Sequence, residues 1–168
     1  PPSSIASLQT QLSKQPQNLK IREALGSAHM KKKDYKSTVN VLAPYANEIS
    51  GDGLIDLAEA YAALQDNMNE IRILKLYAEK NPTKFRPYFL LGNAYKINKK
   101  FDEAAKSLRQ AISYAPKHRP SYNALLQIFT ETKQNYESRV LLGEMIQAFG
   151  DKAEFNNGLC KLYAIDNF

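Results

Sequence analysis

One segment, residues 85–118, reads FRPYFLLGNAYKINKKFDEAAKSLRQAISYAPKH. Its first part places Tyr88, Leu91 and Tyr95 three and four residues apart, which is the spacing of one helix face. After a polar turn at 98–100, a second apolar stripe holds Phe101, Ala104, Ala105, Leu108, Ala111 and Ile112. Pro116 ends this stripe, because proline is poorly tolerated inside a helix. The segment therefore predicts two antiparallel helices joined by a short turn.

The pattern recurs along the chain with a period of 34 residues. In the first helix of each period, a leucine column holds Leu57, Leu91, Leu125 and Leu159, and an aromatic column holds Tyr61, Tyr95, Phe129 and Tyr163. Beside the leucines, a column of small or apolar residues holds Ala58, Gly92, Leu126 and Cys160. In the second helix, a further column holds Leu74, Leu108 and Leu142. Self-similarity at such a period is typical of helical-repeat proteins, whose units bury their apolar faces against their neighbours.

The period divides the chain into full repeats, which we predict at 19–50, 51–84, 85–118 and 119–152. Partial repeats flank them at 4–16 and 153–168, and we predict that 1–168 is one domain. Pro44 lies inside the second helix of the first repeat, where we expect a kink or an early end. Because a helical array normally ends in a polar capping helix, the half-repeats favour a fragment of a longer protein. The alternative is a complete small domain with uneven ends.

These residues resemble the tetratricopeptide repeat (TPR), and the resemblance extends over essentially the whole chain. It is fullest in 85–118, where the motif residues are Tyr88, Leu91, Gly92, Tyr95, Ala104, Leu108, Ala111 and Pro116. The other repeats match less fully, because Glu70 and Ser138 replace the alanine at the helix crossing point. The resemblance implies an all-α fold, a right-handed superhelical α-solenoid of antiparallel helix pairs with about four and a half repeats and nine or ten helices. It also implies a non-catalytic scaffold for protein–protein interaction.

Composition argues against several other classes. The chain has 43% apolar and 24% charged residues, as globular proteins do, and no apolar run approaches the roughly 18 residues of a membrane span. Its single cysteine, Cys160, excludes an internal disulfide. No Gly-rich phosphate loop and no catalytic or metal-binding motif is present, so we predict no enzyme activity, no cofactor and no metal site.

The histidines and the cysteine have structural interpretations. His29 falls in the aromatic column and Cys160 in the small-residue column, so we expect both to pack in the core. His118 lies in a turn between two basic residues, where we expect it to be solvated.

The TPR resemblance also implies where a partner binds. First helices line a concave groove, and the second, fifth, ninth, twelfth and thirteenth residues of each repeat face it. In the repeats from residue 85 onward, these positions include Thr130, Glu131 and Glu154 as well as the residues that we predict to bind a partner. The predicted partner-binding residues are Arg86, Phe89, Asn93, Lys96, Asn123, Gln127, Asn157 and Lys161.

The chemistry of this set suits a peptide. Its amides are Asn93, Asn123, Gln127 and Asn157, its cations are Arg86, Lys96 and Lys161, and its aromatic residue is Phe89. Amides both donate and accept hydrogen bonds, so they can read a peptide backbone, and a guanidinium can hold a carboxylate. We therefore expect the groove to bind a peptide or helix of an acidic partner protein. The alternative is an exposed helix face that is polar only because it is exposed.

Charge leaves two further functions open. The net charge is +6, but residues 37–71 hold six acidic and no basic side chains, whereas residues 72–119 hold twelve basic and three acidic ones. Basic clusters at 31–33, 99–100 and 117–119 suggest a nucleic acid or another acidic surface, although the acidic repeat interrupts them. Self-association through the terminal helices is the other alternative. We expect a cytoplasmic protein, with the periplasm left open, and the Lys-, Asn- and Gln-rich composition is compatible with a bacterial source.

Overall fold

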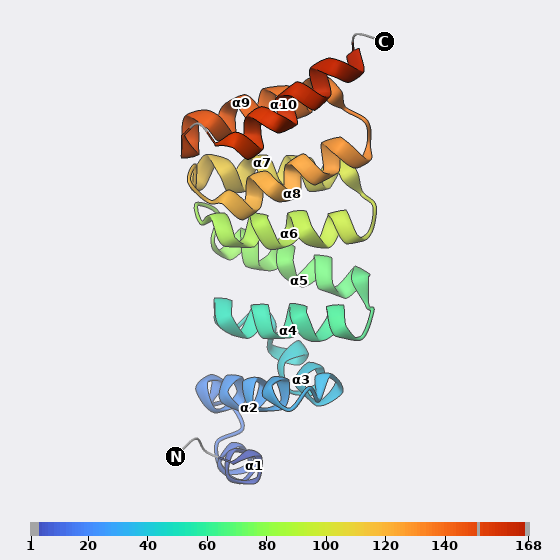
Figure 1. Cartoon of the computed structure of the whole chain (residues 1–168). Helices are drawn as coiled ribbons and strands as arrows, with labels where there is room; N and C mark the ends of the chain where they lie inside the picture. The colour runs from blue at the N-terminus through green and yellow to red at the C-terminus, as the bar shows by residue number, and fades with distance from the viewer. Residues whose placement is uncertain (1–3, 151, 167–168) are drawn as a thin grey trace. The chain divides into compact units, whose positions relative to one another are not determined.

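The computed structural model describes residues 4–150 and 152–166, which form ten α-helices and one short 3-10 helix and contain no strand. The chain divides into two compact units, residues 1–82 and 83–168, whose helices are labelled in Figure 1. The first unit contains α1 (Ile5–Lys14), α2 (Leu19–Lys31), α3 (Tyr35–Leu42), the 3-10 helix η1 (Ala43–Tyr45), α4 (Gly51–Ala63) and α5 (Asn67–Lys80). The second contains α6 (Phe85–Ile97), α7 (Phe101–Tyr114), α8 (Arg119–Glu131), α9 (Asn135–Phe149) and α10 (Ala153–Asp166). The predicted all-α fold is confirmed, and the single domain over 1–168 stays a prediction.

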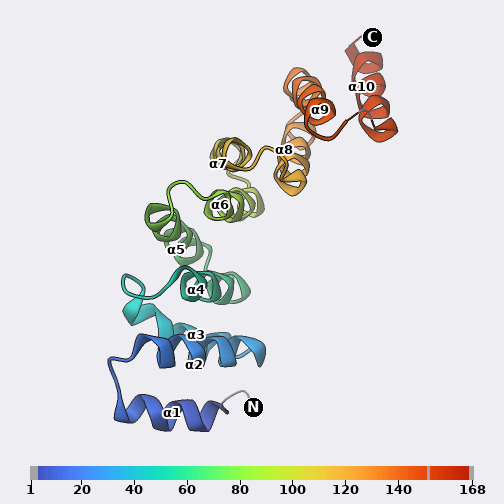
Figure 2. The ribbon, with the colours of Figure 1, turned by 90° about the vertical axis from the view of Figure 1, so that its left-hand side faces the viewer.

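The helices pair as the repeat predicts. Within each unit, α2 packs on α3, α4 on α5, α6 on α7, and α8 on α9 (Figure 2). The residues of the predicted columns supply the contacts, since Leu57, Leu74, Leu91, Leu108, Leu125 and Leu142 are all buried. No helix in the described parts of the chain is both long enough and apolar enough to cross a membrane.

A close approach between the two helices of a pair explains the small-residue column. A Cβ atom added to Gly92 on α6 would lie 2.5 Å from Leu108 Cγ on α7, and one added to Gly26 on α2 would lie 2.7 Å from Leu42 Cγ on α3. Real Cβ atoms do not approach carbon this closely, so a glycine lets the leucine of the second helix lie against the backbone of the first. The small-residue column therefore reflects an interlock that the α2–α3 and α6–α7 pairs share.

The turn inside each pair also repeats its geometry. One residue of the turn is left-handed in four pairs, with φ of 58° at Lys33, 60° at Gln65, 56° at Lys99 and 56° at Lys133. The next amide then donates to a carbonyl near the end of the first helix, as Lys100 N does to Tyr95 O at 2.9 Å. This bond closes the first helix and starts the second without a longer loop.

The first repeat ends early, as Pro44 predicts. Helix α3 stops at Leu42 and the chain continues as η1, with Pro44 in the first turn of that 3-10 helix. Arg22 holds this segment against the rest of the unit. Its Nη2 donates to Pro16 O at 2.7 Å, and its guanidinium carbon lies 3.6 Å from the centroid of the Tyr45 ring.

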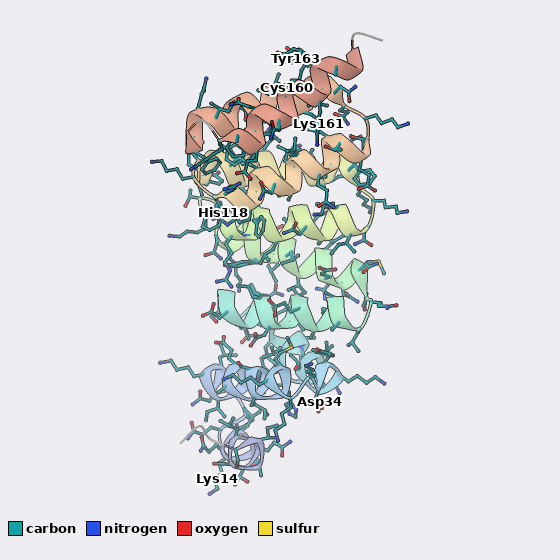
Figure 3. The ribbon with its side chains drawn as sticks, in the orientation of Figure 1. Lys14, Asp34, His118, Cys160, Lys161 and Tyr163 are labelled. Atoms are coloured by element: carbon teal, nitrogen blue, oxygen red, sulfur yellow. The ribbon has the colours of Figure 1, made fainter. Side chains whose placement is uncertain are left out.

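Three of the titratable side chains show where packing follows the pattern and where it departs from it. His29 is buried as predicted, with Nδ1 3.2 Å from Asp34 Oδ2. Glu70, at the crossing point of α4 and α5, is buried too, and burial raises the pKa of its carboxyl group. The prediction for Cys160 is wrong, because this thiol is exposed on α10 (Figure 3). In the other repeats the second helix covers this column, and no second helix follows α10 within the described residues.

Helix capping differs between the two units. Side chains of Ser4, Asn18, Asp34, Ser50 and Asp66 accept a backbone N–H at the start of α1 to α5. The residues at the same place before α6 to α9 are Lys84, Lys100, His118 and Gln134, and none of them caps its helix. Lys100 has φ −88° and ψ 71°, and Asp66 has φ −87° and ψ 70°, so an aspartate at position 100 would have the geometry of a cap.

We therefore predict that Lys100→Asp stabilises the second unit by about 1 kcal/mol, because it adds a cap and removes a cation from a helix N-terminus. The midpoint of thermal unfolding should rise. Lys106→Glu, which makes the same change of charge in the middle of α7, is the control. Equal midpoints for the two variants would contradict the assigned capping position.

Candidate functional site

The eight predicted partner-binding residues all lie in the second unit, on the first helices α6, α8 and α10. Of these side chains, Arg86, Asn123, Gln127, Asn157 and Lys161 are exposed, whereas Phe89, Asn93 and Lys96 are half-buried. On each helix they are offset from the leucine and aromatic columns, which are buried on α6 and α8, because residues four and seven apart form a stripe of their own. The helices thus present a polar face beside an apolar one.

A hydrogen bond joins two of these helices on the polar face. Lys96 Nζ on α6 donates to Gln127 Oε1 on α8, at 2.9 Å. The two residues are 31 positions apart in sequence, and both belong to the predicted set. This contact places part of the α6 surface next to that of α8.

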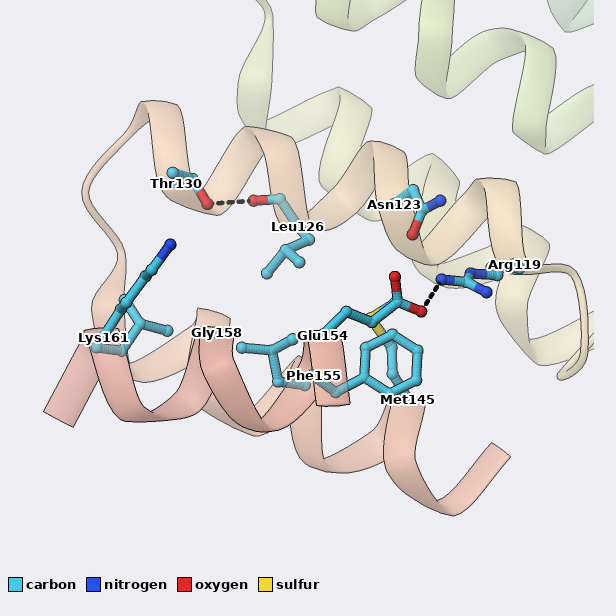
Figure 4. Close-up of a pocket in the computed structure, with 11 residues that line it drawn as sticks. Arg119, Asn123, Leu126, Thr130, Met145, Glu154, Phe155, Gly158 and Lys161 are labelled. Carbon is cyan, nitrogen blue, oxygen red and sulfur yellow. Dashed lines mark hydrogen bonds and ion pairs between the residues drawn. The ribbon is translucent and has the colours of Figure 1, made fainter. Parts of the chain in front are cut away.

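Two adjoining hollows lie along α8. One has a volume of about 520 Å³ and is lined by Asn123, Leu126, Gln127, Thr130 and Glu131. The other has about 490 Å³ and lies between α8 and α10 above α9, where it is lined by Arg119, Asn123, Leu126, Thr130, Leu142, Met145, Glu154, Phe155, Gly158, Lys161 and Leu162 (Figure 4). Because Asn123, Leu126 and Thr130 line both, the hollows form one continuous depression. We call the hollow between α8 and α10 the α8–α10 pocket.

The α8–α10 pocket is apolar at its base and charged at its ends. Leu142 and Met145 of α9 are buried beneath it, and Phe155 of α10 is buried at its side. At one end Arg119 Nη2 forms an ion pair with Glu154 Oε1, and Lys161 lies at the other (Figure 4). The lining therefore holds two cations and one carboxylate.

The ring of Phe89 is half-buried and packs against the ring of His118. Its ring centroid lies 4.8 Å from that of His118, which also lies 4.5 Å from the ring of Phe85. The prediction that His118 is solvated is therefore wrong. The ring is half-buried between α6 and the start of α8, with Nδ1 2.8 Å from Ser121 Oγ, and burial lowers its pKa.

The structure brings together only part of the predicted set. Asn123 and Gln127 line the depression with Lys161, and Lys96 reaches Gln127 from α6. Arg86, Asn93 and Asn157 line neither hollow. Sequence reasoning missed Arg119, Leu126, Phe155, Gly158 and Leu162, although Leu126 was visible as a bulky residue in the small-residue column.

The equivalent face of the first unit has a different character. Glu23 on α2 has a structural role there, since its carboxylate accepts from Ser50 N at 2.6 Å and from Ser50 Oγ at 2.9 Å at the start of α4. Asp56 on α4 faces Ser27, Asp52 and Glu23, and burial raises the pKa of its carboxyl group. The carboxylates around α4 would repel an anionic ligand, and the second unit is the better candidate site for an acidic partner.

The fold defines the class: an all-α protein of repeated antiparallel helix pairs whose first helices carry a polar, partly hollowed face. Comparison with known proteins identifies one of these helix pairs as a tetratricopeptide repeat. A family model described as "Tetratricopeptide repeat" matches residues 85–118. The chain therefore contains a tetratricopeptide repeat at the segment that carries the fullest motif, and the predicted resemblance is confirmed.

Solved structures share the fold at low sequence identity. "Crystal structure of MamA" has a TM-score of 0.72 at 18% identity and covers 98% of this chain and 90% of that one. "MamA 41-end from Desulfovibrio magneticus RS-1" has a TM-score of 0.74 at 14% identity, covering 86% and 82%. A thermophilic TPR protein of Thermus thermophilus has a TM-score of 0.60 at 16% identity, covering 95% and 89%. A search of curated proteins finds no match.

We predict that acid destabilises the second unit through His118. Its pKa is lowered in the folded state, so the unfolded chain takes up the proton first as pH falls below the ordinary value of 6.5. The stability that the neutral ring contributes is complete above that value and declines as pH falls through it toward the lowered pKa. The thermal midpoint of the chain should fall more between pH 7.5 and 5.5 than that of His118→Gln, and parallel profiles would contradict the assignment.

Proposed function

We propose that this protein is a non-catalytic interaction module that binds a peptide or a helix of an acidic partner protein along α6, α8 and α10. The site is the depression on α8 together with the side chains that flank it from α6 and α10. It adds a specific surface to a fold whose resemblance to the TPR family already implies protein binding.

The observation that carries the proposal is the continuity of the two hollows on α8. They share three lining residues, so an extended segment can pass from one to the other without leaving the surface. Asn123 lies in both hollows and Gln127 in one, and their amides offer donors and acceptors to a peptide backbone. Lys96 supports the Gln127 amide from α6.

Charge favours an acidic partner. Arg86, Lys96 and Lys161 are positive, and none of them forms an ion pair with a carboxylate of the described residues. Glu154, the carboxylate of the α8–α10 pocket, is already paired with Arg119. A carboxylate on the partner would therefore meet cations whose charge is not locally neutralised.

A peptide library displayed on phage tests the proposal even though the natural partner is unidentified. We expect the chain to select peptides rich in Asp or Glu. The double variant Asn123→Ala/Gln127→Ala should bind them roughly tenfold more weakly, since each lost hydrogen bond costs about 0.5–1.5 kcal/mol. Fluorescence anisotropy with the labelled peptides measures this change.

Asn40→Ala/Gln147→Ala is the matched control, because it removes one exposed asparagine and one exposed glutamine from the second helices α3 and α9. Its affinity should equal that of the unaltered chain. Equal loss in both double variants, or none in either, would overturn the groove assignment. Recovery only of nucleic acid from a lysate, abolished by high salt, would instead favour the basic clusters as the functional surface.

A further inference from the structure

The α8–α10 pocket departs from a groove made by first helices alone. Its base is formed by Leu142 and Met145 of the second helix α9, which are 3% and 1% exposed. A ligand that lies on α8 and α10 therefore reaches the buried core of the repeat at this point. The neighbouring hollow has no such base, because all of its lining residues belong to α8.

Leu126 explains why the pocket exists. It occupies the column that holds Gly26, Ala58 and Gly92 in the other repeats, where a small residue lets the helices of a pair interlock. A leucine at this place lies half-buried in the pocket wall, and α8 and α9 are the most loosely packed of the four pairs. The departure from the repeat thus opens space above α9.

Gly158 keeps that space open on the side of α10. A Cβ atom added there would lie 3.1 Å from Leu142 Cδ1 and 3.5 Å from Leu142 Cδ2, so even an alanine would crowd the base of the pocket. The absence of a side chain at this position keeps the space beside Leu142 unfilled where α10 borders the pocket (Figure 4).

The volume and lining suit one large apolar side chain with a carboxylate beside it. About 490 Å³ lies within the range of roughly 300–1,000 Å³ that is typical of ligand pockets. The walls are leucine, methionine and phenylalanine, and Lys161 stands at the end away from the Arg119–Glu154 pair. An aliphatic or aromatic group would fill the base, while an acidic group would lie near Lys161.

We propose that the α8–α10 pocket is an anchor site for a bulky apolar residue, such as Leu, Met or Phe, that has an Asp or Glu next to it in the partner peptide. This inference rests on the proposed function and names the kind of sequence that the groove selects. A peptide is the occupant that the surroundings favour, since the pocket opens into the hollow where Asn123 and Gln127 offer backbone hydrogen bonds. Buried apolar anchors of this kind dominate the binding energy of many interfaces.

The test uses labelled 12-residue peptides that present one Phe between two Glu residues in a Gly-Ser background. Matched peptides carry Ala in place of Phe, or Gln in place of both Glu residues. Fluorescence anisotropy should show the Phe peptide binding at least tenfold more tightly than the Ala peptide. The Gln peptide should bind more weakly than the Glu peptide.

Two pairs of variants locate the effect. Thr130→Trp places a large ring at the pocket mouth and should reduce binding of the Phe peptide about tenfold. Thr10→Trp is the control, because both threonines are exposed and donate to the carbonyl four residues earlier, at 2.8 Å in Thr130 and 3.0 Å in Thr10. Lys161→Gln should abolish the preference for Glu over Gln, whereas Lys106→Gln on α7 should retain it.

The outcomes separate this inference from the proposed function. If Phe and Ala peptides bind equally and Thr130→Trp has no effect, while Asn123→Ala/Gln127→Ala still weakens binding, the anchor site is overturned and the groove stands. If neither set of variants affects peptide binding, both are overturned. If the Phe peptide loses affinity only in Thr130→Trp and not in the control, the anchor site is supported.

Discussion

The close approach of Leu108 to the backbone at Gly92 is the constraint on which the rest of the second unit depends. No side chain other than hydrogen fits at Gly92, and the leucine fills the space that a side chain would need. The same relation between Gly26 and Leu42 holds α2 and α3 together in the first unit. Because the interlock brings the helices of a pair close together, a short turn with one left-handed residue, at Lys99 or its equivalents, connects them.

The candidate site lies where this interlock is relaxed. The side chain of Leu126 occupies the space in which Leu108 packs against Gly92 in the preceding pair, so Leu142 cannot pack in the same way. The α8–α9 pair is correspondingly more loosely packed. The space that results is apolar at its base and is framed by polar side chains of first helices. The proposed binding site thus lies where the repeat has a leucine in place of the usual small residue.

The helix pairs could be predicted from sequence because each depends on contacts that recur every 34 residues. The turn at 98–100 and the early end of α3 before Pro44 could be predicted from the residues at those positions alone. Asn123, Gln127 and Lys161 line the depression, as their place in the repeat suggested, and their binding of a partner stays a prediction. The depth of the α8–α10 pocket could not be predicted, because Met145 on α9 and Phe155 on α10 line it together with α8, and this depends on how three helices pack. The predictions for His118 and Cys160 were wrong because burial depends on packing between helices and not on neighbours in sequence. The rings of Phe85 and Phe89 cover His118, whereas no second helix covers Cys160 within the described residues.

Hydrogen–deuterium exchange of the chain, alone and saturated with a selected acidic peptide, measures directly whether the peptide binds along α6, α8 and α10. We expect slower exchange in α8 and α10 and in the end of α6 that carries Lys96, with no change in α1 to α5. Protection confined to the lysine-rich turns at 31–33 and 99–100, or to the first unit, would contradict it. Such a result would move the binding surface from the groove of the second unit to the edge of the helix pairs.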